Sequence, residues 1–110
     1  LNPQKIGSVN FIYKKMDFDA QDLKNFAQNF KKENNLVLML SSTLGSKVLI
    51  TLLISNDLIS EGYNAKDLII ILSKEISGTG GGQDYIATAG GSNQKGLDNT
   101  VKKIKELFAK

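Results

Sequence analysis

Six of the ten glycines in this 110-residue chain lie within fourteen residues, the segment GTGGGQDYIATAGG at 78–91. Successive glycines allow positive φ angles and let backbone N–H groups approach a ligand closely, so such a segment can bind a phosphate. The same glycines can serve tight turns and close packing, and the local sequence leaves both interpretations open. The segment lacks the G-x-G-x-x-G spacing of dinucleotide-binding turns. The stretch GSNQKGL that follows has Leu97 and Asp98 where a P-loop has Lys and then Ser or Thr.

The chain contains no His and no Cys, which excludes most catalytic and metal-binding chemistry. It has no imidazole base, no thiol nucleophile and none of the usual nitrogen or sulfur ligands of zinc. The acidic pairs Asp17 with Asp19 and Asp57 with Glu61 are better explained by helix capping and loop solvation than by a metal site. We therefore expect no catalytic residue, no metal ligand and no cofactor in this chain.

All fourteen basic residues are Lys, and the chain has a net charge of +3 and a pI near 9.1. This basic excess is compatible with nucleic-acid binding. Without Arg, the bidentate fork that reads guanine is missing, whereas Lys provides point charges suited to the phosphate backbone. A polyanion would therefore be recognised by its shape and phosphates rather than by its bases.

Length and hydrophobic patterning predict a single domain over residues 1–110, with helices packed on a mixed β-sheet in the order β-α-β-β-α-β-α, an α/β (α+β) fold. The apolar runs are too short to cross a bilayer and no leader segment opens the chain, so we expect no membrane association and a cytoplasmic location. The chain begins with Leu1 rather than Met, which predicts that it is excised from a longer polypeptide.

The elements that must position the glycine segment can be placed from local signals. Residues 5–16 form the first strand, and Asp19 caps a helix whose apolar stripe spans residues 23–30. Two apolar runs, 36–41 and 48–55, predict a hairpin of central strands that are covered on both faces.

The second half of the chain is predicted to form a helix, a short strand and a last helix. Asn64 is the expected N-cap of a helix that Gly78 ends as a left-handed C-cap. Residues 84–89 form a short strand between the glycines. The last helix then carries an apolar stripe formed by Leu97, Val101, Ile104 and Phe108.

The glycine segment, preceded by a helix ending LSKEIS and followed by a Lys-bearing amphipathic helix, resembles the signature of the C-terminal domain of alanyl-tRNA synthetase. This glycine-rich domain is also appended to DHH-family phosphoesterases. The resemblance extends over essentially the whole chain, through DLKNFAQNF, the apolar hairpin and ISNDLISEGYNAKDLIIILSKEI. By position, Gly80 to Gly82 match the family's glycine triplet, and Ala87, Ala89, Gly90 and Gly91 match its A-x-A-G-G.

Two positions depart from this family pattern. Gln83 stands where many alanyl-tRNA synthetases have Arg and where the phosphoesterases typically have a substrate-binding His. Asp84 stands where the synthetases usually have Pro. Gln83 argues against the phosphoesterase branch, and the Asp84 carboxylate would repel a phosphate at the tip of the segment unless it is paired.

The resemblance implies a non-catalytic module that binds the outer corner of alanine-specific tRNA and supports the aminoacylation and editing domains of the same chain. ATP, magnesium and zinc would bind only to those other domains of this ligase. Two alternatives stay open. One is the substrate-binding domain of a DHH-family phosphoesterase acting on nucleic acids or nucleotides, and the other is a module for protein interaction or homodimer formation through an edge of the hairpin.

We expect the nucleic-acid contacts beside the glycine segment and on the last helix. The lysines supply phosphate contacts, and the polar side chains donate hydrogen bonds to sugar or phosphate. A solvated helix face is the competing explanation for the lysines. Tyr85 either stacks on a base or sugar or covers the sheet. The expected nucleic-acid-binding residues are Gly80, Gly81, Gly82, Gln83, Gly90, Gly91, Ser92, Asn93, Lys95, Lys102 and Lys103, with Gln94 and Lys105 beside them.

Overall fold

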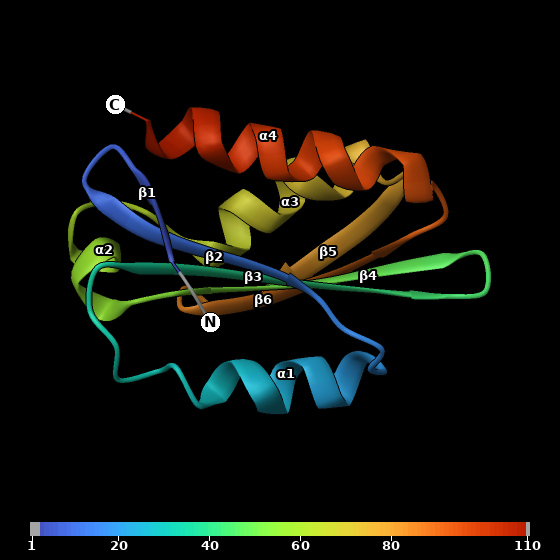
Figure 1. Cartoon of the computed structure of the whole chain (residues 1–110), viewed down its shortest axis with the longest axis horizontal. Helices are drawn as coiled ribbons and strands as arrows, with labels where there is room; N and C mark the ends of the chain where they lie inside the picture. The colour runs from blue at the N-terminus through green and yellow to red at the C-terminus, as the bar shows by residue number, and fades with distance from the viewer. Residues whose placement is uncertain (1–2, 110) are drawn as a thin grey trace.

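The computed structural model describes residues 3–109 as a six-stranded mixed sheet with helices on both faces (Figure 1). The strand order is β1-β2-β3-β4-β6-β5, with β2 and β3 parallel and the other four pairs antiparallel. This architecture confirms the predicted mixed sheet with packed helices. The strands are β1 (Gln4–Ile6), β2 (Val9–Lys15), β3 (Leu36–Leu44), β4 (Lys47–Ile54), β5 (Gly78–Gly82) and β6 (Ile86–Gly91). The helices are α1 (Ala20–Gln28), α2 (Asn56–Ser60), α3 (Ala65–Glu75) and α4 (Leu97–Phe108), and a 3-10 turn at Gln94–Gly96 precedes α4.

Three elements differ from the predicted order. The first predicted strand is split at Gly7, whose φ of 57° turns the chain between β1 and β2. The short helix α2 lies between the predicted hairpin and the helix that begins after Asn64, where no element was predicted. β5 consists of four glycines and Thr79, residue types whose pattern predicts turns rather than strands.

The predicted N-caps are confirmed, whereas the predicted C-cap is wrong. The Asp19 carboxylate accepts a hydrogen bond from the backbone N–H of Asp22 at 2.8 Å. Asn64 accepts from the first turn of α3 in the same way. After α3 the left-handed residue is Ser77, with a φ of 54°, and Gly78 is instead the first residue of β5.

The predicted hairpin forms the centre of the sheet. β3 and β4 are joined by a two-residue connection in which Gly45 has a φ of 61°. β3 pairs with β2 on its other side, and β4 pairs with β6. Leu40 and Leu53 face α1, whereas Met39 faces the opposite core, which explains the near-continuous apolar runs. β1 and β5 are the outer strands of the sheet, so most of the hairpin has a strand on each side; β3 beyond Ser41, where its pairing with β2 ends, does not.

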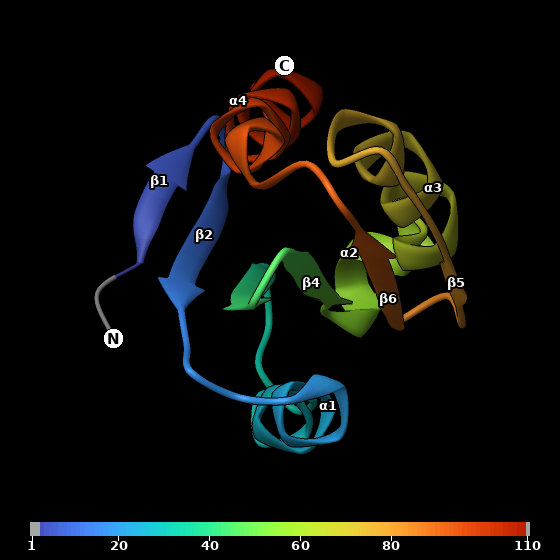
Figure 2. The ribbon, with the colours of Figure 1, turned by 90° about the vertical axis from the view of Figure 1, so that its right-hand side faces the viewer.

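The helices divide unequally between the two faces of the sheet. Helices α2, α3 and α4 pack together over one face with the larger hydrophobic core, which includes the predicted α4 residues Leu97, Ile104 and Phe108. On the opposite face α1 contributes Leu23 and Ala27 to a smaller core over β3 and β4. Figure 2 shows that α1 lies under β4 and that no helix lies under β6 and β5 on that side. The glycine strands are therefore left uncovered on the α1 face.

Asp57 fixes the turn that leads from α1 into β3. Both of its carboxylate oxygens accept from the backbone N–H of Asn35 at 3.0 Å, and Asn35 has a φ of 54°. A hydrogen bond from the Ser55 side chain, followed by the bond from Asn35, lowers the pKa of Asp57. Asp57 is thus a structural residue, which agrees with its expected role outside any metal site.

Replacing Asp57 should reveal this role in the pH dependence of stability. Because folding lowers the pKa of Asp57, its stabilisation is complete above the unfolded pKa and is lost as pH falls through the folded-state pKa. Asp57→Asn should lower the free energy of unfolding at pH 7 by about 1 kcal/mol, and the difference should shrink at pH 2. Chemical denaturation at both pH values measures this, with Glu61→Gln as an exposed control. An equal difference at pH 7 and pH 2 would contradict the assignment.

Candidate nucleic-acid interface

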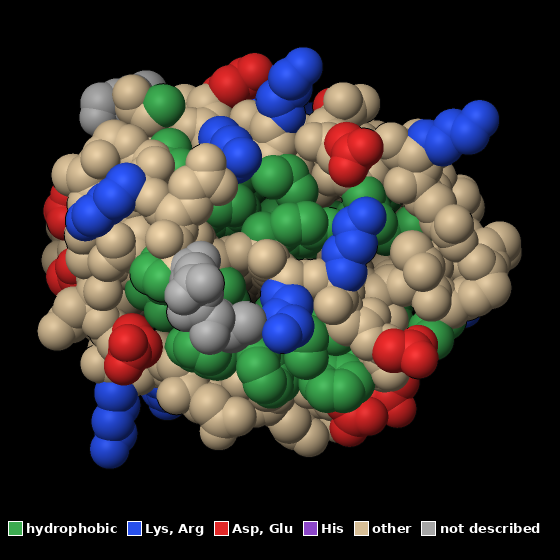
Figure 3. All heavy atoms as spheres, in the orientation of Figure 1, with side chains coloured by type: hydrophobic (Ala, Val, Ile, Leu, Met, Phe, Trp, Pro, Cys, Tyr) green, Lys and Arg blue, Asp and Glu red, His purple; other side chains and the backbone are tan. Residues whose placement is uncertain are grey.

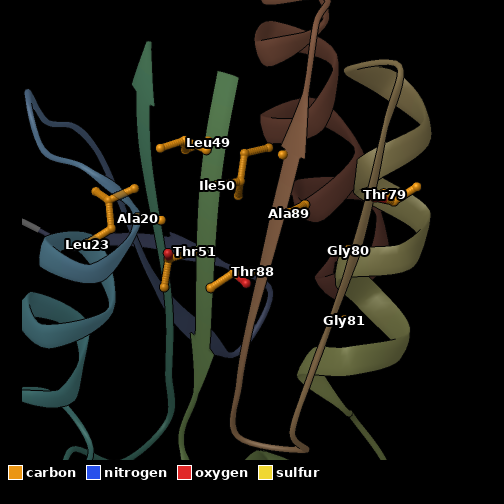
Figure 4. A pocket seen from close by; sticks show the side chains of 11 residues that line it. Ala20, Leu23, Leu49, Ile50, Thr51, Thr79, Gly80, Gly81, Thr88 and Ala89 are labelled. Carbon is orange, nitrogen blue, oxygen red and sulfur yellow. The ribbon is translucent and has the colours of Figure 1, made fainter. Parts of the chain in front are cut away.

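A groove of about 450 Å³ lies on the α1 face between α1 and the edge strand β5. Figure 4 shows Ala20 and Leu23 of α1 on one side of it and Thr79, Gly80 and Gly81 of β5 on the other. β4 and β6 lie between them and form the floor. The residues that line the groove are apolar residues, glycines and threonines, and none is charged.

Three glycines of β5 are required by the close approach of β5 to β6. A Cβ atom at Gly78 would overlap the carbonyl oxygen of Gly90. A Cβ at Gly80 would lie 2.9 Å from both the Cβ of Ala89 and the carbonyl oxygen of Thr88. Gly82 has a φ of 152°, which L side chains rarely adopt, and its Cβ would also meet β6. Alternate residues of β5 are therefore glycine for packing.

Gly91 and Gly96 are required by contacts with the end of α3. A Cβ at Gly91 would overlap the carbonyl oxygen of Ile76, and a Cβ at Gly96 would overlap that of Glu75. The Ile76 carbonyl also accepts hydrogen bonds from the backbone N–H groups of Ser92 and Asn93, both at 2.9 Å. These glycines therefore allow the chain to pass closely over the end of α3 before α4 begins.

Gly81 and Gly90 are not required by the described structure. A Cβ at Gly81 would have no heavy atom of the described residues within 4 Å, apart from its chain neighbours. A Cβ at Gly90 would make only ordinary contacts, 3.6 Å from the Leu49 side chain and 3.9 Å from the carbonyl oxygen of Val48. Both line the α1-face groove, and each is paired across the strands with a threonine, Gly81 with Thr88 and Gly90 with Thr79. Their bare backbones keep the groove open.

Most backbone N–H groups around the glycines donate hydrogen bonds within the fold. The N–H of Gln83 donates to Ile86 at 2.8 Å, and those of Ser92 and Asn93 donate to Ile76. The glycine segment is therefore an antiparallel hairpin of β5 and β6 rather than a loop whose N–H groups surround a phosphate. Packing accounts for most of its glycines, and the open groove accounts for the remaining two.

Three further hollows lie near the groove, and each shares lining residues with its neighbour. The second hollow, about 470 Å³, shares Leu49 and Gly90 with the groove. The third, about 700 Å³, shares Ser46 and Ser92 with the second. The fourth, about 280 Å³, shares Gln94 with the third. We call the second, third and fourth hollows the hairpin track, because they follow the tip of the β3–β4 hairpin. The residues that line the track are Lys15, Met16, Ser41 to Thr43, Gly45 to Leu49, Ser77, Gly90 to Lys95 and Leu97.

The hairpin track is lined by lysines and by no acidic residue. Lys47 lines its second hollow, Lys95 its third and Lys15 its fourth. Lys102 and Lys103 lie instead in a separate hollow together with Glu75 and Glu106. On the face shown in Figure 3, lysines and acidic side chains are interspersed without a single basic patch. The carboxylate-free lining distinguishes the track from the surface of α4.

The structure brings together only part of the predicted nucleic-acid-binding set. Gly80, Gly81 and Gly90 lie in the α1-face groove, whereas Gly82 and Gln83 lie at the β5–β6 turn, beyond the lining of the groove. The predicted residues in the hairpin track are Gly90, Gly91, Ser92, Asn93, Gln94 and Lys95.

Two polar side chains that were predicted to bind nucleic acid form hydrogen bonds within the fold. The Asn93 amide nitrogen donates to the carbonyl oxygen of Glu75 at 3.3 Å, and that of Gln94 donates to the carbonyl oxygen of Gly45. These bonds hold the start of α4 against α3 and against the hairpin tip. Ser92 and Gln83 are exposed.

Lys15 and Lys47 were not predicted as binding residues. Lys15 lies near the end of the first predicted strand and Lys47 in the turn of the predicted hairpin. Their proximity to the start of α4 arises from the tertiary fold. For Tyr85 the sequence leaves two roles open, stacking on a base or sugar and covering the sheet. In the structure its side chain is half-buried against the α1-side core, and the Lys31 ammonium lies 4.8 Å from its ring centroid. Tyr85 therefore covers the sheet.

The residues that the structure describes contain no cluster of three or more Asp or Glu side chains arranged to bind a metal. None of their helices has the length and hydropathy needed to span a membrane.

Comparison with known proteins gives consistent matches over nearly all of the chain. The DHHA1 domain family matches residues 8–110. Alanine–tRNA ligases of Cytophaga hutchinsonii and Christiangramia forsetii are 39% identical over 108 residues and 36% identical over 107 residues. Each match covers 96% of this chain but 12% of the relative, so the chain spans about an eighth of the length of these enzymes. The crystal structure of the C-Ala domain from Aquifex aeolicus alanyl-tRNA synthetase matches with a TM-score of 0.91 and 25% identity, and the match covers 100% of both chains.

The two classes of glycine should differ in their effect on stability. Gly80→Ala places a methyl group against β6 and should lower the free energy of unfolding by about 1–3 kcal/mol. Gly81→Ala places it in open space and should change the free energy by no more than about 0.5 kcal/mol. Urea denaturation of both variants measures the difference. Similar losses in both variants would show that Gly81 is also required for packing.

Proposed function

Because this chain belongs to the DHHA1 domain family, and because it is similar over 96% of its length to alanine–tRNA ligases, we propose that it is the non-catalytic, tRNA-binding C-terminal domain of an alanyl-tRNA synthetase. Residues 1–110 then form one domain of a longer cytoplasmic enzyme that joins alanine to its tRNA. In this proposal ATP, magnesium and zinc bind to the other domains, which share the bound tRNA with this one.

The observation that carries this proposal is the pair of open glycines beside a lysine-lined surface. Gly81 and Gly90 expose backbone in the α1-face groove without being required for packing. Gly90 also lines the hairpin track, where Lys47 and Lys95 follow. A sugar–phosphate strand needs both features, because the ribose requires close approach to a surface and the phosphates require cations.

The chemistry of the track favours recognition of an RNA backbone. Ammonium groups attract phosphates without fixed geometry, and the absence of carboxylates from the lining removes local repulsion. In the groove, the hydroxyls of Thr79 and Thr88 lie on the strands that carry the open glycines, where they can bond to ribose hydroxyls. Modest affinity suffices in a multidomain enzyme, since the other domains raise the effective concentration of the tRNA.

The phosphoesterase alternative lacks a supporting feature in the structure. That role assigns a substrate-binding His to position 83, where this chain has Gln. Gln83 is exposed at the β5–β6 turn, beyond the lining of the groove. An amide does not ionise near neutral pH, so Gln83 does not supply the positive charge that a protonated imidazole offers to a substrate phosphate.

Charge reversal should distinguish the hairpin track from the surface of α4. The Lys47→Glu and Lys95→Glu double variant should weaken the binding of alanine tRNA by at least about tenfold and flatten the dependence of log Kd on log salt by about 1.8, that is, about 0.9 for each lost phosphate contact. Titration at several salt concentrations measures both effects. The matched control is the Lys102→Glu and Lys103→Glu double variant, whose lysines lie beside Glu75 and Glu106. A larger loss in this control would move the RNA surface to α4.

Filling the groove should weaken tRNA binding without unfolding the chain. Gly81→Ala adds a methyl group where the structure leaves open space, so it should weaken alanine-tRNA binding about fivefold, or about 1 kcal/mol. The measurement is a titration at fixed salt, accompanied by the melting temperature. Unchanged affinity in a normally folded variant would remove the groove from the proposed interface.

A further inference from the structure

Two threonines lie side by side on the floor of the α1-face groove. Thr51 of β4 is directly opposite Thr88 of β6 in the strand register. Leu53 and Ile86, two residues along the same strands, belong to the core on the α1 side. Because side chains two residues apart on a strand point to the same face, both threonines also point to that side, as Figure 4 shows. Both line the groove, so their hydroxyls are presented to the same space.

The β-ladder brings these two side chains close together. The backbone N–H of Ile54 donates to the carbonyl oxygen of Tyr85 at 2.9 Å, which makes these residues a hydrogen-bonded pair. Such pairs alternate with non-hydrogen-bonded pairs, whose side chains are closer. Thr51 and Thr88, three residues further along each strand, are a non-hydrogen-bonded pair. Cβ atoms of directly opposite residues lie about 4.5–5.5 Å apart, so one ligand group can contact both hydroxyls.

The Thr51 hydroxyl has no partner among the described residues, although Thr51 is only 1% exposed. Within the described chain, Ser42 Oγ is the one side-chain polar atom that is both unbonded and closed to solvent. Thr51 Oγ1 therefore keeps the accessible surface of its residue, and this surface opens into the groove that Thr51 lines. Buried hydroxyls without a hydrogen bond destabilise a protein. The missing partner of Thr51 must come from the groove.

The lining of the groove favours a neutral hydroxyl over a phosphate. None of the lining residues is charged. A threonine hydroxyl both donates and accepts hydrogen bonds, and so does the 2′-hydroxyl of ribose. Two threonine hydroxyls can thus bind one ribose hydroxyl as its donor and its acceptor. Gly81, across from Thr88, and Gly90, two residues along from it, leave space for the sugar ring beside them.

We propose that Thr51 and Thr88 bind the 2′-hydroxyl of one ribose in the α1-face groove and thereby make this domain select RNA over DNA. The inference rests on the proposed function for RNA as the partner, and it adds the chemical group that the groove recognises. A deoxyribose in the same place would leave the Thr51 hydroxyl without a partner. The phosphates beside this ribose would lie outside the uncharged groove, where Lys47 of the hairpin track can contact one of them.

Deoxynucleotide interference on alanine tRNA tests this assignment. Pools of the tRNA that carry single 2′-deoxy substitutions are separated into fractions bound to and free from the 110-residue chain. One substituted position should weaken binding about three- to tenfold, the effect of losing a hydrogen bond between neutral groups. Thr51→Val and Thr88→Val should each weaken the binding of unmodified tRNA and abolish the interference at that position, because the two changes remove the same contact. Thr88→Ser is the matched control, since it keeps the hydroxyl and should keep the interference.

The melting temperature of Thr51→Val without RNA gives an independent readout. Valine has nearly the shape of threonine, and no hydrogen bond within the described chain is lost. The variant should therefore melt at the same temperature as the parent chain or higher. A lower melting temperature would show that the Thr51 hydroxyl is bonded within the fold and would overturn its role as a ribose contact.

The binding results separate this inference from the proposed function. If alanine tRNA binds and every 2′-deoxy effect persists in Thr51→Val and Thr88→Val, the ribose site is overturned while the proposed function stands. If Thr88→Ser loses the interference as Thr88→Val does, the hydroxyl is not the group that acts, and the ribose site is again overturned. If alanine tRNA does not bind to the parent chain at any salt concentration, the proposed function itself fails.

Discussion

The structure depends on the close contact of two backbones, those of β5 and β6. At Gly78, Gly80 and Gly82 a Cβ atom would meet the neighbouring strand, so any other residue type would strain this pairing. The same constraint applies after β6, where the chain passes over the carbonyl oxygens at the end of α3. The backbone contact therefore sets the spacing between α3, the sheet edge and the start of α4, and the position of α4 in turn places Lys95 beside the hairpin tip.

On the α1 face no helix covers β5 and β6, and this determines which residue types line the surface there. Helix α1 buries Leu23 and Ala27 against β3 and β4 and extends no further. The uncovered strands present glycines and threonines instead of large apolar side chains, so the surface remains compatible with water and with a polar partner. The central hairpin then leads from this uncharged groove to a region where lysines line the surface without carboxylates.

Features encoded by local signals could be predicted from the sequence, whereas those that depend on tertiary contacts could not. The caps at Asp19 and Asn64 were predicted correctly because a capping side chain bonds within its own turn. Strand β5 was missed because glycine disfavours strands unless another backbone lies too close for a side chain, and that neighbour is absent from the pattern. Lys47 was not predicted as a candidate site residue for the same reason: it lines the hollow next to that of Lys95, which lies 48 positions away in sequence.

Glycine-rich binding segments are commonly flexible, and the open glycines of this chain lie in a different setting. Gly81 and Gly90 belong to strands that are held in register by their ladder partners. Their bare backbone is therefore already ordered before any ligand arrives, and little chain entropy remains to be lost on association. Gly81 and Gly90 thus combine the steric freedom of glycine with the rigidity of a β-sheet, so a partner meets a preorganised surface.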